Sequence, residues 1–267
     1  MRLKLLIDAD MFAFIACSTA THEAEWESGI SSYFADFEEV KANFTSRLDS
    51  AIETALSHHH YTGDYDILLC LSDPADNFRR RILPTYKAHR KGQKPLCYWK
   101  LCDWMKREGD VYIRPSLEAD DCIGILATME KNRDNCLIIS GDKDMKTLPG
   151  RQYDFLRDTY AELSEEDADR NFLMQTLTGD PTDGYSGCPK VGAVNATRIL
   201  DEDCSWAAVV RAFEKQHLTE QDAITQARVA RILRASDYDF KRKEVRLWTP
   251  PAALSPKEKS ASCVIPS

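Results

Sequence analysis

The chain has 267 residues, of which 43% are hydrophobic and 29% charged, and its formal net charge is −8. These values are typical of a globular protein with one large domain, or one domain and an appendage. No apolar run approaches the roughly 20 residues of a membrane-spanning helix, which excludes an integral membrane protein of that kind. The nine cysteines form no C-x-x-C pair, so we expect a reduced, cytoplasmic protein without disulfides or zinc.

The first part of the chain alternates predicted strands with predicted helices. Strands are predicted at residues 3–7, 66–71, 110–113 and 136–140, and helices at 39–57, 96–107 and 117–131. In the first of these helices, Val40, Phe44 and Leu48 recur at helical spacing. Such alternation predicts an α/β fold, with a parallel-rich sheet flanked by helices on both faces.

Beyond about residue 160 the pattern changes to helices alone. They are predicted at residues 163–178, 192–200, 205–216 and 220–235. We therefore divide the chain into a core at 1–160, a helical region at 161–248 and a tail at 249–267. The tail is rich in Pro, Ser and Lys, which predicts disorder.

Acidic residues gather where predicted elements begin or end. They follow three of the strands, open the helix at 117–131, and lie in the glycine-rich loop GDPTDGYSG. Any one of them alone is better explained as a helix cap or a solvated loop residue. The nine are Asp8, Asp73, Glu118, Asp120, Asp121, Asp142, Asp144, Asp180 and Asp183.

Together these acids indicate a metal site, because the carboxyl ends of parallel strands lie at one edge of a sheet. Carboxylates gathered there would repel one another unless cations lay between them. Oxygen ligands suit hard divalent ions, and a pair of such ions is the equipment of phosphodiester hydrolysis. We therefore expect a nuclease with two Mg²⁺ ions, for which Mn²⁺ can substitute.

Residues 79–94 form a basic segment that contains no acid, and this local charge matters more to DNA than the global net charge. A solvated charged face is the plain alternative. Lys87 and Arg90 are three residues apart, so a helix would place both on one face, against a scissile phosphate. Tyr86 is expected to stack on a terminal base. The residues predicted to contact DNA are Arg79, Arg80, Arg81, Tyr86, Lys91, Lys94, Gly187, Lys190 and Gly192.

The loop at 179–192 combines two acids with several glycines before an amphipathic stretch. Glycine lets backbone groups approach a phosphate closely. A tight turn of this kind between helices fits a grip on a DNA duplex, with an ordinary helix–helix connection as the alternative.

Five motifs stand in the order found in the 5′-nuclease (flap endonuclease) superfamily, which the chain resembles from residue 3 to 250. They are LIDAD, LSDPADNFRRRILPTYKAHRK, EADDCIGILA, ISGDKDMKTL and GDPTDGYSGCPKVGAVNATRIL. The details are most similar to the 5′→3′ exonucleases of short-tailed phages. This resemblance implies a PIN-like nuclease core, an arch segment at residues 78–107 that is helical, and a C-terminal helix–turn–helix (H3TH-like) element.

The resemblance also implies roles for individual residues. Asp8, Asp73, Glu118, Asp120 and Asp121 would surround a first metal ion, and Asp142, Asp144, Asp180 and Asp183 would hold a second. Lys87 and Arg90 match arch residues that contact the scissile phosphate. The chain departs from the family where Lys190-Val191-Gly192 replaces a G-x-G turn, and where Phe14, Ile15 and Ala16 replace an arginine-bearing stretch.

The function expected from these observations is 5′→3′ exonuclease action on duplex DNA ends in phage-type replication or recombination. Removal of RNA from RNA–DNA hybrids is a further expectation, and no obligate protein partner is inferred. Three alternatives stay open: a structure-specific 5′-flap endonuclease, a PIN-type ribonuclease, and a DNA-binding module without catalysis.

Overall fold

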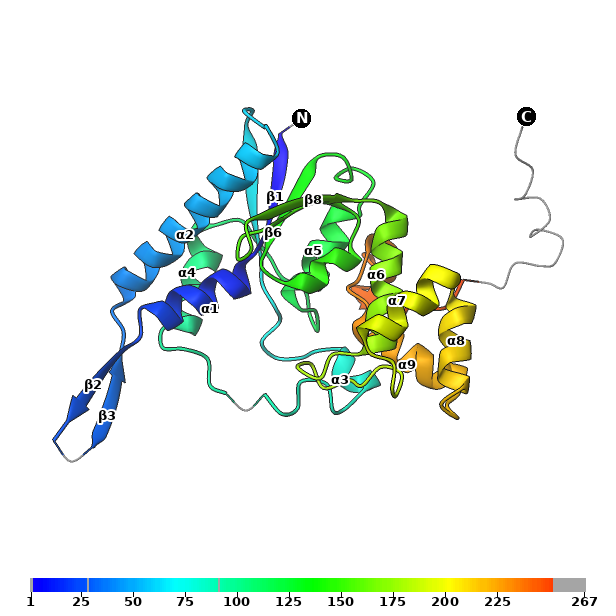
Figure 1. Cartoon of the computed structure of the whole chain (residues 1–267). Helices are drawn as coiled ribbons and strands as arrows, with labels where there is room; N and C mark the ends of the chain where they lie inside the picture. The colour runs from blue at the N-terminus through cyan, green and yellow to red at the C-terminus, as the bar shows by residue number, and fades with distance from the viewer. Residues whose placement is uncertain (1, 28, 91, 252–267) are drawn as a thin grey trace.

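The computed structural model describes residues 2–27, 29–90 and 92–251, and its centre is a sheet of six strands (Figure 1). All neighbouring strands in the sheet are parallel except the last pair, which is antiparallel. In spatial order they are β5 (Val111–Tyr112), β4 (Tyr65–Cys70), β1 (Leu3–Asp8), β6 (Cys136–Ser140), β7 (Gly150–Asp154) and β8 (Thr159–Leu163).

The central strand β1 has a near-continuous apolar sequence because both of its faces are covered. Leu5 and Ile7 pack with α1 (Ala9–Thr19), α2 (Phe37–His58) and α4 (Tyr98–Glu108) on one side of the sheet. Leu6 packs on the other side with α5 (Ala119–Ala127). The prediction of helices on both faces of a parallel-rich sheet is confirmed.

The strand order reverses direction at β1, and this reversal locates the site. From β1 the chain proceeds to β4 and β5 on one side, and β6 then returns to the other side of β1. Where strand order reverses in an open α/β sheet, a crevice forms outside the carboxyl ends of the strands. Asp8 ends β1 and Asp142 follows β6 by two residues, so both lie at this crevice.

Several strands were not predicted. β2 (His22–Trp26) and β3 (Ile30–Phe34) form a hairpin that projects from the ends of α1 and α2 (Figure 1). Its strands are largely exposed, so they carry no regular apolar alternation. The expectation that strands cease beyond residue 160 is wrong, because β8 ends at residue 163 and β9 (Tyr238–Asp239) pairs with β10 (Glu244–Val245).

The C-terminal helices pack around a core of their own. They are α6 (Glu165–Thr178), α7 (Ala193–Glu202), α8 (Trp206–Glu214) and α9 (Glu220–Ala230), and their shared core includes Phe172, Val209 and Phe213. The last helix ends five residues earlier than predicted. The chain then runs past α5, where Ile232 and Leu233 join the core of the sheet.

The arch segment contains two helices rather than one continuous helix. It contains the four-residue α3 (Arg79–Ile82), then turns over residues 84–89, and then α4. Pro84 disfavours helical backbone in the residue before it, and Lys87 has a positive φ of 51°. Lys91 and the tail from 252 onward lie outside the described residues. Across the described ranges, no helix is both long and apolar enough to cross a membrane.

Candidate metal centre

The ends of β1 and β6 bring the first carboxylates of the site together. Asp8 caps α1 through the amide of Met11, and it accepts a hydrogen bond of 2.7 Å from the Ser140 hydroxyl at the end of β6. Asp142 lies two residues after Ser140, and its carboxylate accepts a hydrogen bond of 2.9 Å from the amide of Asp144. The sequence LIDAD therefore places Asp8 beside the motif ISGDKD, as the strand-end pattern predicted.

Asp73 lies beside the start of α5, and its carboxylate is held by backbone amides. It accepts hydrogen bonds from Ala75 at 2.9 Å and from Ser116 at 2.7 Å, while its own amide bonds to Leu117. Asp73 thus fixes the loop that leads into Glu118. Its predicted role as a direct ligand stays a prediction.

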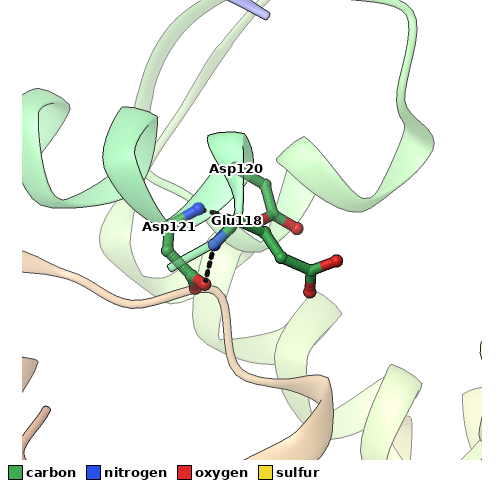
Figure 2. A group of neighbouring side chains, drawn as sticks. All are labelled: Glu118, Asp120 and Asp121. Carbon is green, nitrogen blue, oxygen red and sulfur yellow. Dashed lines mark hydrogen bonds between the residues drawn. The ribbon is translucent and has the colours of Figure 1, made fainter. Parts of the chain in front are cut away.

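Three acids at the start of α5 form a cluster in which one oxygen each lies within 4.8 Å of the others: Glu118, Asp120 and Asp121. Figure 2 shows that the carboxylates of Glu118 and Asp120 point to the same side, whereas that of Asp121 points away from them. Both Asp121 oxygens accept from the Arg79 guanidinium, at 2.6 and 2.7 Å, and one also accepts from the amide of Leu233. Asp121 therefore supports the site through Arg79, and its predicted role as a metal ligand stays a prediction.

Burial contradicts three of the predicted DNA contacts. Arg79 is 1% exposed, and its guanidinium also donates to the carbonyls of Val229 and Arg231. Tyr86 is 2% exposed, so its ring cannot stack on a base. Gly187 is also buried, and a Cβ there would lie 2.3 Å from the amide nitrogen of Gly179. Charge and residue type in the sequence suggested exposure, but for Arg79 and Tyr86 the packing of the arch segment against α5 and α9 removes it.

The two catalytic candidates of the arch segment reach the carboxylates directly. Lys87 Nζ lies 2.5 Å from Glu118 and 3.5 Å from Asp183, and the Arg90 guanidinium donates to Asp183. The Tyr86 hydroxyl joins the same pair of acids, at 2.8 and 3.2 Å. These contacts join the loop that carries Asp183 to the start of α5. The two segments are far apart in the sequence, so no local sequence pattern could have predicted the contact.

The acids of the second group are also neighbours of one another. Asp180 accepts from Lys143 Nζ at 3.0 Å and from the amide of Thr182 at 2.8 Å. Lys143 lies between Asp142 and Asp144 in sequence, so it links the β6 loop to the loop after α6. Sequence reasoning did not identify Lys143, although its position inside D-K-D was a usable signal. Asp10, the second acid of LIDAD, accepts from the Tyr98 hydroxyl and from the amide of Ser72.

Burial makes full ionisation of the cluster unfavourable. Burial raises the pKa of Asp8 to about 7, with further contributions from Asp10 and Asp142. Burial and Asp142 likewise raise the pKa of Asp144 to about 6, and burial with Asp121 and Glu118 raises that of Asp120 well above its usual value. Carboxylates whose charge is this poorly compensated are suited to cations.

Two acids behave oppositely because cationic side chains already neutralise them. Burial alone would raise the pKa of Glu118, but Lys87 and Arg79 hold it at about 2. For Asp180, burial is likewise outweighed, and Lys143 and the Thr182 amide lower its pKa. Lys87, Arg79 and Lys143 therefore neutralise part of the negative charge of the acidic cluster.

We expect the metal-free protein to lose stability as pH rises from about 5 to about 8. The folded pKa of Asp8, about 7, exceeds its unfolded value of 3.8, and that of Asp144, about 6, does as well. The stability that these protonated carboxyls contribute is fully present below the unfolded pKa. It is lost as the pH rises through the folded pKa, because the folded state must then give up protons that the unfolded state has already lost. The lowered pKa values of Glu118 and Asp180 act only at more acidic pH.

Melting temperatures in EDTA would fall across that range, and a saturating divalent cation would restore them at the upper end. Asp8→Asn should flatten the curve in EDTA. A melting temperature that is constant or rising with pH in metal-free wild type would contradict the assignment of these pKa values.

The remaining predicted DNA contacts lie on the surface. Arg80, Arg81, Lys94, Lys190 and Gly192 are exposed, with Arg81 paired to Asp76 and Lys94 Nζ 4.3 Å from the Tyr98 ring centroid. Gly192 caps the start of α7, one of the helices joined by the loop at 179–192. Their contact with DNA stays a prediction.

Comparison with known proteins identifies relatives over almost the whole chain. Residues 5–172 match the family described as "5′-3′ exonuclease, N-terminal resolvase-like domain". The exonuclease of Escherichia phage T7 is 30% identical across 92% of this chain and 93% of that protein. The exodeoxyribonuclease of Enterobacteria phage T3 is also 30% identical, across 92% of each. Among solved structures, a T5 5′-exonuclease with bound zinc matches with a TM-score of 0.62 at 16% identity, covering 86% of this chain and 89% of that one.

Proposed function

The chain belongs to the 5′-3′ exonuclease family, and from this premise we propose that it is a metal-dependent 5′→3′ exonuclease acting on duplex DNA. The observation that carries the proposal is the acidic cluster at the point where strand order reverses, with Lys87 and Arg90 directed into it. The names of the phage T7 and T3 relatives support the same activity.

We assign the metal ligands to seven of the nine acids at the crevice. They are Asp8, Glu118, Asp120, Asp142, Asp144, Asp180 and Asp183, with Asp73 ordering the loop before Glu118. Mg²⁺ is the expected ion because all of these donors are hard oxygens. Bound there, divalent ions would polarise the scissile phosphate and lower the pKa of the attacking water.

Lys87 and Arg90 are the residues of this chain that would contact the substrate phosphate. Their present partners, Glu118 and Asp183, belong to the proposed ligand set. Metal binding would compete for these carboxylates and free the two cations. Directed at a phosphate at the crevice, they would stabilise the charge that develops on it.

We further propose that the helical region at 161–248 grips the duplex through the turn between α6 and α7. Exposed Lys190 and the backbone of Gly192 lie before the start of α7, where amides and the helix dipole favour a phosphate. Lys190→Ala is expected to weaken duplex binding several-fold without changing the rate of the bound complex. A single-turnover rate that falls while affinity stays constant would contradict this role.

The proposal is tested with Mg²⁺ and three substrates, each labelled once at its 5′ end and once at its 3′ end: blunt duplex, 5′-flap duplex and RNA–DNA hybrid. Immediate release of mono- or short oligonucleotides from the 5′ label of the blunt duplex, abolished by EDTA, is the expected result. A single larger product from the flap alone would move the assignment to flap endonuclease. One relative of this chain, 30% identical over 66% of it, carries that name. Retained binding with no cleavage would indicate a DNA-binding module.

A further inference from the structure

A cavity of about 360 Å³ lies between α2 and the end of β7, apart from the acidic cluster. The helix contributes Asn43, Ser46, Arg47, Ser50 and Thr54, and the recurrence at three or four residues from Asn43 through Arg47 and Ser50 to Thr54 places them along one side of the helix. α2 is the long blue helix in Figure 1. A volume of this size is within the range of small-molecule sites.

Among the described residues that line this cavity, Arg47 is the one that carries a charge. Its Nε is buried and has no hydrogen-bond partner within the described part of the chain. Three other arginines also have a buried nitrogen without such a partner, but each is paired with an acid: Arg151 with Glu162, Arg170 with Asp201 and Arg234 with Asp169. Among residues 2–27, 29–90 and 92–251, no carboxylate lies within ion-pair distance of Arg47. A buried polar atom left without a partner is costly and calls for an explanation such as a ligand.

The rest of the lining supplies uncharged donors and aromatic side chains. No hydrogen bond within the described ranges occupies the Ser46 hydroxyl or the Asn43 amide, so both are available to a ligand. Tyr153 borders the cavity but is 4% exposed, and its hydroxyl donates to Asp158, so it closes one side of the space without offering an open ring face. Phe155 lies beside it and stacks on Phe12, with ring centroids 4.2 Å apart.

We propose that this cavity binds a small phosphate-bearing molecule of nucleotide size. The guanidinium of Arg47 would pair with the phosphate, since its planar donors suit phosphate oxygens. Ser46 and Asn43 would donate to the same group or to the attached sugar, and Tyr153 with Phe155 would line the space for a ring. A 5′-mononucleotide has this chemistry, and the binding itself does not depend on the proposed nuclease activity.

The test is isothermal titration calorimetry of the full chain in EDTA with three probes: 5′-dAMP, inorganic phosphate and deoxyadenosine. We expect 5′-dAMP to bind one molecule per chain, and Arg47→Met to weaken it at least about tenfold, because a charge-assisted hydrogen bond is lost. Lys87→Met is the matched control for the acidic crevice and should bind 5′-dAMP as the wild type does. Deoxyadenosine should bind far more weakly than 5′-dAMP.

Several outcomes would overturn the proposal: no binding of 5′-dAMP, equal affinity in Arg47→Met, loss of binding in Lys87→Met, or equal affinity for deoxyadenosine. Inorganic phosphate binding as tightly as 5′-dAMP would retain the phosphate site but overturn the space for a ring. Arg47→Met should melt at the wild-type temperature or above it, because it removes a buried unsatisfied nitrogen. Its exonuclease activity should also be unchanged, so this result is separable from any failure of the proposed function.

Discussion

Asp142→Asn is expected to reduce the single-turnover rate of DNA cleavage by roughly 10³-fold or more, while affinity for duplex DNA in EDTA stays the same or increases. Asp142 lies at the crevice edge beside Asp8 and holds the amide of Asp144. Asparagine keeps the acceptor for that amide but removes one negative charge from the proposed ligand set. Loss of a metal contact removes several kcal/mol of transition-state stabilisation, and each 1.36 kcal/mol corresponds to about a tenfold change in rate.

Binding is expected to respond in the opposite direction because acids at the crevice oppose the phosphate backbone. The matched control is Asp49→Asn, which makes the same substitution at an exposed position on α2 and should leave the rate unchanged. Wild-type cleavage by Asp142→Asn in saturating Mg²⁺ would exclude Asp142 from the metal centre. Parallel loss of cleavage and duplex affinity would instead indicate a binding role.

The acids of this site were predictable because strand ends are visible in a sequence. An apolar run followed by Asp, as in LLIDAD and CLIISGD, marks both the element and its carboxyl end, and parallel order brings those ends together. The elements that sequence reasoning missed lack such a contrast. The β2–β3 hairpin has no buried face, and β8 is an edge strand in which no residue is fully buried, so neither displays a clear apolar alternation.

The arch segment shows what charge in a sequence does not specify. Arg79, Arg80 and Arg81 are consecutive and chemically identical, but Arg79 is buried against α5 whereas its two neighbours are exposed. Only tertiary contacts distinguish Arg79 from its two neighbours. Those contacts are made with Asp121 and with backbone carbonyls some 150 residues away. The same contacts decide that Asp121 points away from Glu118 and Asp120. Sequence thus predicted which residue types meet at the crevice, but not which member of each run faces it.

Arg79→Met is expected to cost about 3–5 kcal/mol of unfolding free energy, the typical penalty for leaving a buried charge unpaired. Asp121 is 0% exposed and would lose both of its bonds to the guanidinium. The carbonyls of Val229 and Arg231 would also lose a donor, so the segment after α9 would be released from the sheet core. Chemical denaturation monitored by circular dichroism measures this change, and Arg80→Met, at an exposed position, should stay within about 0.5 kcal/mol of wild type.

A double substitution separates an unpaired charge from lost packing. If the unpaired Asp121 carboxylate is the main cost, adding Asp121→Asn to Arg79→Met should recover part of the lost stability, because no buried charge then remains without a partner. Asp121→Asn alone should be destabilising, since Arg79 would lose its two-oxygen partner and keep only the 3.1 Å ion pair with Glu118. Arg79→Met as stable as Arg80→Met would mean that the pair does not hold the arch segment to α5. Glu118 would then depend on Lys87 and Tyr86 alone for its position at the crevice.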